Sequence, residues 1–402
     1  MQHRSLGVVA IVVVLANSGG GADARSGAVA TEHRLAAEAG AAMLRADGSV
    51  ADAAVAAAAA VCVVHASSCG IGGGGFALVH ATGADTALDY RETAPAGAVP
   101  ERYLRDGAPD PGSTRRGGLA VAVPGEVAGW VALHGRFGTL PLATVLAPAV
   151  RLARDGFRLG DVPHLATQIE RNLDLLRADA GLRAVFLDAD GNVPGPQAHI
   201  VQHDLAATLE RIGRSGPRAV LGPPAAIAAF VQSRGGVLTT SDLRAYRVVW
   251  REPLVGRFAG RRVVTFPPPG SGGVVLEILG ILAAEDPRGL AAGAFGHLLA
   301  GAMAQAFADR AAWYGDTRVP IRSLLDPARL GALRAAIPPD RVATPIANLQ
   351  PDAGTAHVSV VDTDGNAVAM TTTINTAFGA GLMVPGTGII LNDEMDDFAL
   401  PG

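Results

Sequence analysis

Two threonine hydroxyls near the C-terminal end of the sequence could act together in catalysis. Strands are expected over residues 357–362 and 367–374, because these segments flank Asp364-Gly365, a strong hairpin signal. A three-residue loop between them places Thr355 opposite Thr373 at the start of a strand. A two-residue loop would shift the pairing by one residue and still leave the two threonines near neighbours. Taken alone, Thr355 is better explained by a structural role, because threonine favours strands.

Several other catalytic classes are excluded by residue type. The sequence contains no lysine, so all 33 basic residues are arginines, which rules out P-loop nucleotide binding, pyridoxal Schiff bases and Ser-x-x-Lys acylation. Pro269 stands where a Gly-x-Ser-x-Gly nucleophile elbow around Ser271 would need its first glycine. No His-Glu-x-x-His or Cys-x-x-Cys pattern occurs. The candidate histidines form no ligand motif, so we expect no metal site at His134, His164, His199 or His203.

The glycine-rich segment 70–75 has the spacing of a dinucleotide-binding fingerprint without its context. That fingerprint follows a strand and opens a helix, whereas here a predicted helix comes first and a strand over 76–80 follows. We therefore expect a tight helix-to-strand turn that a backbone or a ligand approaches closely.

Length and charge narrow the class of protein further. A chain of 402 residues with 49% hydrophobic residues forms either two domains or one large globular domain. The formal net charge of −4 and the aromatic content of 4% provide neither a basic stripe nor a surface for stacking bases, so we expect no nucleic acid partner.

The elements that must position these residues follow from periodicity and from turn residues. Helices are expected over 33–46, 50–64, 126–137, 274–284 and 295–314, and the region from 138 to about 250 is predicted to be mostly helical. Further strands are expected over 86–90, 262–266 and 388–391. Residues 316–352 are rich in Pro, Asp and Arg and predict an irregular, exposed segment.

The N-terminus and the two cysteines bear on the cellular compartment. His3 and Arg4 precede an apolar run over 6–16 and the small-residue pattern 22–24, which indicates a secretory signal over residues 1–24 and a periplasmic or secreted protein. The apolar run is too short for a membrane span. Cys62 and Cys69 are expected to be two buried thiols, with a disulfide as the less favoured alternative.

An ordered series of motifs covers the chain from about residue 26 to its last residue. The C-terminal motifs are Gly354-Thr355-Ala356-His357-Val358-Ser359-Val360-Val361-Asp362, Asp364 to Ala369, Thr373-Ile374-Asn375-Thr376 and Gly388 to Phe398. Upstream of them stand Glu32-His33, Gly70 to Phe76, Asp89 to Pro95, Val123-Pro124-Gly125, Pro267 to Gly273, Ala308-Asp309-Arg310 and Gly315-Asp316. Together they closely resemble the gamma-glutamyltranspeptidase (glutathione hydrolase) family.

The resemblance implies an N-terminal nucleophile hydrolase with an α/β/β/α sandwich and a proenzyme that cuts itself. By residue match the cut falls between Gly354 and Thr355, giving a large-subunit region over 25–354 and the start of a small catalytic subunit over 355–402. Thr355 becomes the nucleophile, and Thr373 orients it. The chemistry is consistent, since a freed α-amino group with a pKa of about 7.7 to 8.0 can serve as the base that a threonine hydroxyl needs.

Substrate recognition is also implied by residue match. A γ-glutamyl donor presents a free α-carboxylate and a free α-amine, which a guanidinium fork and carboxylates bind well. Arg91 matches the family's carboxylate-binding residue, and Asn375, Glu394 and Asp397 match the residues on the amine side. Without the resemblance, these side chains would be interpreted as a surface pair and a solvated turn.

Two departures from the family pattern stand out. Ala356 replaces a second threonine found in many members, which we expect to be tolerated. The family's small subunit is several times longer than residues 355–402, so its paired serines and paired glycines, which bind the carboxylate and form the oxyanion hole, have no counterpart here. From this we expect an incomplete sandwich and an inactive 402-residue product.

The predicted function is hydrolysis and transfer of γ-glutamyl groups from glutathione and related amides through a threonyl acyl-enzyme, with no cofactor or metal. The acceptor would be water, an amino acid or a peptide, and the partners are the two subunits of one precursor. One alternative is a noncatalytic family member that binds a ligand or has no function. Another is a sister amidase that acts on a β-lactam side chain or on a polyglutamate capsule.

Overall fold

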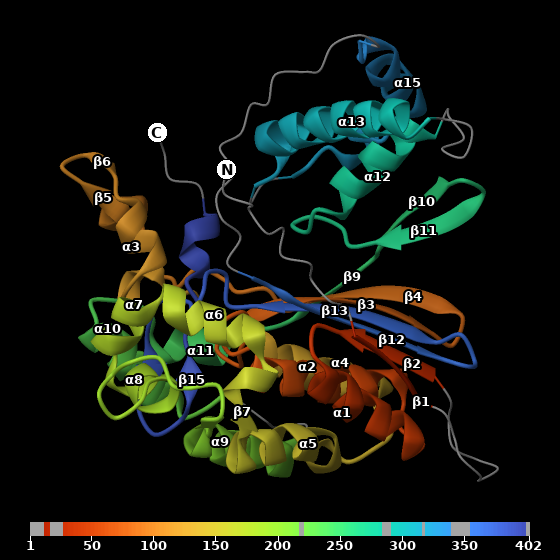
Figure 1. Ribbon diagram of the computed structural model, residues 1–402. Helices are drawn as coiled ribbons and strands as arrows, with labels where there is room; N and C mark the ends of the chain where they lie inside the picture. Colours follow the sequence, from red (N-terminus) through yellow and green to blue (C-terminus); the bar gives the residue numbers. More distant parts are fainter. Residues whose placement is uncertain are drawn as a thin grey trace. The chain divides into compact units, whose positions relative to one another are not determined.

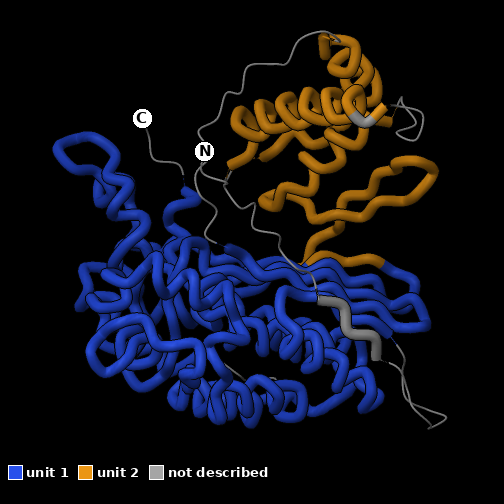
Figure 2. The backbone as a smooth tube through the Cα atoms, viewed as in Figure 1, with its two compact units in different colours: residues 1–84, 88–249, 352–402 blue, residues 85–87, 250–351 orange. Residues whose placement is uncertain are grey.

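The computed structural model describes residues 12–16, 27–216, 221–283, 291–315, 318–338 and 354–398. The chain divides into two units (Figure 2): unit 1 comprises residues 1–84, 88–249 and 352–402, and unit 2 comprises 85–87 and 250–351. Every residue that the sequence analysis assigns to the site belongs to unit 1.

A seven-stranded sheet, most of which belongs to unit 1, has the strand order β1-β2-β12-β13-β3-β4-β9. Its strands are β1 (Val12–Ala16), β2 (Gly27–Thr31), β3 (Gly74–Ala81), β4 (Ala84–Asp89), β9 (Val249–Arg251), β12 (Ala356–Asp362) and β13 (Ala367–Thr373). β12 pairs antiparallel with both β2 and β13, and β13 pairs antiparallel with β3. The C-terminal hairpin therefore lies between strands from the first quarter of the chain.

Helices α1 (Arg34–Arg45), α2 (Val50–Val64), α4 (Glu126–Phe137) and α5 (Leu142–Asp155) lie on one face of this sheet (Figure 1). Every residue of α2 is buried, and the helix packs against α1, α4, α5, β12 and β13. Its alanines allow this, since a small side chain lets neighbouring elements approach closely. Ser49 and Asp52 form a capping box that satisfies its first amide groups.

Apart from a 13-residue helix that packs against α5, the remaining elements of unit 1 are mostly short. Its helices are α3 (Pro111–Arg115), α6 (Pro163–Arg171), α7 (Leu173–Ala178), α8 (Ala180–Phe186), α9 (His203–Ser215), α10 (Pro224–Ser233) and α11 (Thr240–Ala245), with 3-10 turns η1 (Pro100–Tyr103), η2 (Gly118–Ala120), η3 (Leu159–Asp161) and η6 (Glu394–Asp397). Two-stranded sheets pair β5 (Leu104–Arg105) with β6 (Ala108–Pro109), β7 (Phe157–Arg158) with β8 (His199–Ile200), and β14 (Met383–Val384) with β15 (Ile389–Ile390).

Unit 2 contains the hairpin of β10 (Leu254–Phe258) and β11 (Arg261–Thr265) and the helices α12 (Gly272–Leu282), α13 (Ala292–Trp313), α14 (Ile321–Leu324) and α15 (Pro327–Ala336). The irregular segment expected over 316–352 is wrong within residues 321–336, which are largely helical. Pro327 occupies the first position of α15, where proline starts a helix, and Asp326 caps it. Leu330 joins a buried cluster with α12 and α13. Residues 339–353 lie outside the described residues.

The glycine-rich segment is a tight turn against other backbone, as predicted. A methyl group on Gly72 would lie 2.1 Å from the Ile390 carbonyl oxygen, and one on Gly73 would lie 1.9 Å from that of Thr373. Contacts this short leave room for glycine only, so the turn and the end of β13 are packed backbone to backbone.

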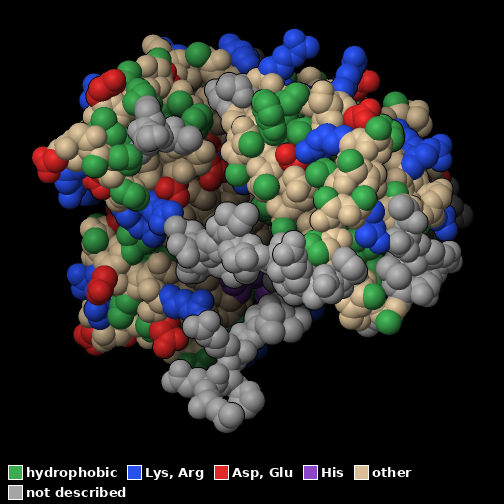
Figure 3. Space-filling model, turned by 90° about the horizontal axis from the view of Figure 1, so that it is seen from above, with side chains coloured by type: hydrophobic (Ala, Val, Ile, Leu, Met, Phe, Trp, Pro, Cys, Tyr) green, Lys and Arg blue, Asp and Glu red, His purple; other side chains and the backbone are tan. Residues whose placement is uncertain are grey.

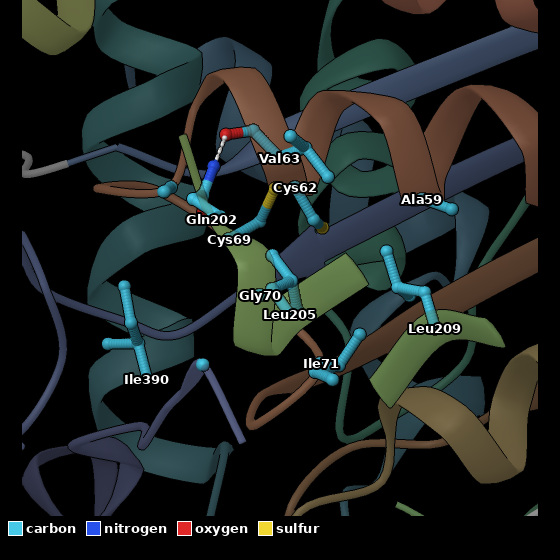
Figure 4. A pocket seen from close by; sticks show the side chains of 12 residues that line it. Ala59, Cys62, Val63, Cys69, Gly70, Ile71, Gln202, Leu205, Leu209 and Ile390 are labelled. Atoms are coloured by element: carbon cyan, nitrogen blue, oxygen red, sulfur yellow. Dashed lines mark hydrogen bonds between the residues drawn. The ribbon is translucent and has the colours of Figure 1, made fainter. Parts of the chain in front are cut away.

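The two cysteines are free and buried, which confirms the expected pair of thiols. Figure 4 shows them beside a small cavity of about 10 Å³, next to Gln202, whose side chain donates a hydrogen bond to the Val63 carbonyl (2.9 Å). Burial raises the pKa of both thiols, so they are neutral and poorly nucleophilic.

Within the expected signal segment, Val12–Ala16 form strand β1, paired with β2. The predicted cleavage pattern at residues 22–24 lies outside the described residues. Among the helices that the structure describes, none is long and apolar enough to cross a membrane. On the face seen in Figure 3, acidic and basic side chains are interspersed, and its described part carries no continuous basic stripe.

Candidate active site

The hairpin of β12 and β13 brings the two predicted threonines together. The Thr355 hydroxyl donates a hydrogen bond to Thr373 Oγ1 at 3.3 Å, and the Asn375 backbone N–H donates to the same oxygen at 2.9 Å. Asp362 N–H bonds to the Asn366 carbonyl across a loop of residues 363–365, so the predicted three-residue loop and its register are confirmed. Thr355 is exposed, whereas Thr373 is buried and therefore fixed in place.

Gly354, on the other side of the predicted cut, has a backbone conformation that suits glycine. Its φ is +112°, in the region that side chains with a Cβ rarely adopt. The residue before the proposed cut therefore has an unusual backbone conformation. Any other residue at position 354 would have a strained backbone.

Arg91 forms the centre of a charged group with two residues of η6. Its Nη2 lies 2.7 Å from Glu394 Oε1 and also pairs with Asp397 Oδ2. The Glu394 side chain is only 2% exposed, whereas that of Asp397 is 50% exposed. Tyr246 donates a hydrogen bond to the Arg91 carbonyl at 2.8 Å, which holds the backbone of this segment. The structure thus brings Arg91 to the acidic residues that were predicted to share its site.

Burial determines how these groups titrate. Burial raises the pKa of Glu394 to about 7; Arg91 lowers it, while Asp397 and Asp393 raise it. Burial also raises the pKa of the adjacent Glu92 well above its usual range. Burial therefore favours the protonated form of Glu92, and with a pKa of about 7 Glu394 titrates around neutral pH.

Asn375 connects the threonine pair to the charged group. Its Nδ2 donates to the Asp393 carbonyl at 3.0 Å, and Thr376 N–H donates to Asp393 Oδ1 at 2.9 Å. Asn375 has a φ of +71°, a conformation that asparagine tolerates better than most residues. Direct contacts therefore run from Thr355 through Thr373 and Asn375 to the backbone that carries Glu394.

Three residues that the sequence analysis did not single out support this connection. Asp393 is fully buried and accepts hydrogen bonds from Thr376, and Arg116 Nη1 lies 3.5 Å from its Oδ2. Burial raises the pKa of Asp393 to about 6, against the lowering effect of Thr376 and Arg116. Arg116 also donates to Thr376 Oγ1 at 2.9 Å. Asp393 and Thr376 lie inside the quoted motifs, but nothing in the sequence links Arg116 to them.

Asn392 is a fourth residue that was missed. It is fully buried, and its Nδ2 donates to the carbonyls of Gly72 (2.8 Å) and Ala122 (3.0 Å). Its Oδ1 accepts from the N–H groups of Ala122 (3.0 Å) and Glu394 (3.1 Å). One side chain therefore joins the glycine turn, the segment before α4 and the backbone of Glu394.

Comparison with known proteins bears on the family of the chain. Residues 36–402 match the model of the family described as gamma-glutamyltranspeptidase. The chain belongs to this family. It is 38% identical to a glutathione hydrolase proenzyme of Pseudomonas aeruginosa, over 99% of this chain and 73% of that protein. It is also 40% identical to the Acylase ACY 1 proenzyme of a Pseudomonas species, strain SE83, over 92% of this chain and 69% of the relative.

A solved structure of the same fold confirms the predicted fold class. The cephalosporin acylase of Bacillus halodurans superposes with a TM-score of 0.82 at 29% identity, covering 100% of this chain and 74% of that one. Within the described residues, the chain forms one large sheet, against one face of which α1, α2 and α4 pack. Relatives of the family carry both hydrolase and acylase names, so membership by itself leaves the leaving group open.

Proposed function

We propose that the protein hydrolyses and transfers γ-glutamyl groups, after cutting itself between Gly354 and Thr355. One observation carries the proposal: an unbroken series of contacts joins the Thr355 hydroxyl to the Arg91–Glu394–Asp397 group. These contacts hold the nucleophile in a fixed position relative to the guanidinium and the carboxylates. A γ-glutamyl substrate likewise carries its reactive amide at a limited distance from its zwitterionic end, so the two can be bound together.

Binding would use both signs of charge in the group. Arg91 contacts both carboxylates through Nη2, and a guanidinium carries donors on two further nitrogens, which can bind a substrate carboxylate. Glu394 and Asp397 would bind the substrate ammonium, with Asn375 beside them. The ammonium would then take over part of the charge pairing that Arg91 supplies in the free protein.

Catalysis would follow from the freed N-terminus. The Thr355 amine accepts the proton of its own hydroxyl, and the hydroxyl oxygen attacks the γ-carbonyl carbon of the substrate. The proton held by the Thr355 amine passes to the amide nitrogen of the substrate, the C–N bond breaks, and the amine product leaves as the acyl-threonine forms. Water or an amino acid then takes the γ-glutamyl group. Thr373 holds the hydroxyl in line through the 3.3 Å hydrogen bond.

Maturation is tested by mass spectrometry of the purified full chain. We expect two fragments, one ending at Gly354 and one beginning at Thr355, and none from Thr355→Ala. Ser233→Ala is the control, because it removes an exposed hydroxyl of unit 1 that bonds to the nearby Phe230 carbonyl and lies outside the site. A fragment that begins at any other residue would overturn the assignment of Thr355.

Substrate class is tested with two anilides of equal length. γ-Glutamyl anilide carries the α-ammonium, whereas glutaryl anilide keeps the carboxylate and lacks the ammonium. In a version extended to the length of the family, we expect preference for the γ-glutamyl compound, and its loss in Asp397→Asn. Equal rates on both compounds would instead support an acylase, the second candidate that the acylase-named relative and the cephalosporin acylase structure favour.

Export to the periplasm or the medium is a further part of the proposal, supported by the apolar run and small-residue pattern of residues 1–24. Cell fractionation tests it, with the N-terminus of the exported protein expected near Arg25. Retention of the intact N-terminus in the cytoplasmic fraction would contradict it.

A further inference from the structure

A hydroxyl–imidazole pair lies against the proposed cleavage site and has no part in the mechanism above. Ser68 Oγ lies 2.9 Å from His164 Nε2. Ser68 belongs to the turn after α2, and His164 to the first turn of α6. A methyl group on Gly354 would lie 2.6 Å from Ser68 Oγ and 3.7 Å from His164 Nε2. Both groups therefore reach the residue whose carbonyl carbon is attacked during self-cleavage.

Ser68 is fixed relative to the threonine pair. It is 2% exposed, and its carbonyl accepts a hydrogen bond from Ile374 N–H at 3.3 Å, one residue after Thr373. The preceding carbonyl, of Ser67, accepts from Phe378 N–H at 3.0 Å. The end of β13 thus holds Thr373 near the Thr355 hydroxyl and holds Ser68 near Gly354, on the other side of the bond to be cut.

The surroundings of His164 favour its neutral form. Its ring stacks on His65 with centroids 4.9 Å apart, and His33 lies beyond His65 at 5.9 Å. Burial lowers the pKa of His164; Glu32 raises it and Arg171 lowers it. Burial lowers the pKa of His65 to about 3, so His65 is neutral as well. A neutral imidazole can take a proton from a serine hydroxyl and give it back.

We propose that Ser68 and His164 form a proton relay for cleavage of the Gly354–Thr355 peptide bond, an inference that rests on the proposed self-cleavage. Thr355 Oγ1 attacks the Gly354 carbonyl carbon, the C–N bond breaks, and an ester to the Thr355 oxygen forms. The proton lost from the hydroxyl must reach the departing nitrogen. The Ser68 hydroxyl takes this proton from Thr355 Oγ1 while passing its own proton to His164. The proton then returns from His164 through Ser68 to the departing nitrogen. Water then hydrolyses the ester, leaving a carboxylate on Gly354 and restoring the hydroxyl.

Ser68 is the catalytic residue in this proposal, and His164 is a positioning residue that acts through it. The experiment is a pulse-chase of the full chain from cell-free synthesis, with the two fragments followed over time between pH 5 and 8. We expect Ser68→Ala and His164→Ala to slow cleavage about 100-fold. Added imidazole should restore part of the rate in His164→Ala only. The rate of the parent chain should fall in acid as His164 is protonated, and that dependence should disappear in His164→Ala.

The controls remove matched exposed groups of unit 1. Ser233→Ala removes a hydroxyl that bonds only to a nearby carbonyl, and His203→Ala removes an imidazole at the start of α9. Both should be cleaved at the parent rate. Parent-rate cleavage of Ser68→Ala and His164→Ala would overturn the relay and leave the proposed function intact. Slow cleavage without imidazole rescue or a changed pH profile would also overturn it, because a purely structural role gives that result. Cleavage of Thr355→Ala at the same bond would instead refute the proposed function.

Discussion

Replacement of Asn392 by alanine should destabilise unit 1 and loosen the site at the same time. The side chain makes four hydrogen bonds of 2.8 to 3.1 Å in a fully buried position. Each such bond contributes about 0.5–1.5 kcal/mol net, and each partner left unsatisfied in the core costs about 1–3 kcal/mol. Partial relaxation reduces the sum, so we expect a loss of about 3–5 kcal/mol in the free energy of unfolding.

Urea unfolding followed by fluorescence measures this loss. Trp130 is buried in α4 of unit 1, so replacing Trp250 and Trp313 with phenylalanine in every variant leaves a probe of that unit alone. The control is Asn366→Ala, because Asn366 bonds to Asp362 and to a backbone N–H at the partly exposed hairpin loop, and its loss should cost about 1 kcal/mol or less. A loss below about 1 kcal/mol in Asn392→Ala would refute the view that this residue ties the three segments together.

Three further changes test the site and its support. Arg91→Lys keeps the charge but loses the guanidinium fork. The binding free energy of a γ-glutamyl substrate, measured by isothermal titration calorimetry, should therefore weaken by about 1.5–3 kcal/mol. Because the pKa of Glu394 is raised to about 7 and an ammonium is bound by the ionised carboxylate, affinity should strengthen from pH 6 to pH 8, and Glu394→Gln should remove this dependence. Gly73→Ala would place a methyl group 1.9 Å from the Thr373 carbonyl oxygen and should cost about 3 kcal/mol or more by urea unfolding, whereas Gly135→Ala, with nothing within 4 Å, should be neutral or stabilising. A neutral Gly73→Ala would mean that the close backbone packing is not required.

The parts of the fold that were predicted are those fixed by local pattern. The helix at Val50–Val64 and the one at Glu126–Phe137 have the expected bounds. Ser49 caps the start of the first helix, and Gly125 and Gly138 flank the second. The hairpin register followed from a turn sequence and alternation alone. The helix at Pro327–Ala336 was missed because the segment was interpreted from its content of Pro, Asp and Arg, whereas proline at the first helical position favours the start of a helix.

The parts of the site that were missed depend on contacts between distant segments. Asn392 is 320 residues from Gly72 and 270 residues from Ala122 in the sequence, and Arg116 meets Asp393 across a similar separation. Buried hydrogen-bond partners have no periodicity along the chain, so composition and spacing carry no signal for them. Ser68 and His164 illustrate the same point. They form a hydrogen-bond pair in the structure, but in the sequence they are an isolated serine and a histidine without a ligand motif.

The position of β12 within the sheet explains how a cut chain could keep its nucleophile in place. A break between Gly354 and Thr355 would remove one covalent bond at the start of β12, but the ladders of this strand with β2 and with β13 would remain. The new N-terminus would therefore lie one residue from the first pair with β13, Ala356 with Thr372, while the pairing with β2 begins at Ser359. Between these points, the Glu32 side chain accepts a hydrogen bond from His357 N–H at 2.6 Å. If the nucleophile stood at the freed end of an edge strand, that end would fray. The nucleophile would then lose the orientation that the reaction requires. Placement of the nucleophile at the start of an interior strand thus makes cleavage compatible with a fixed catalytic geometry.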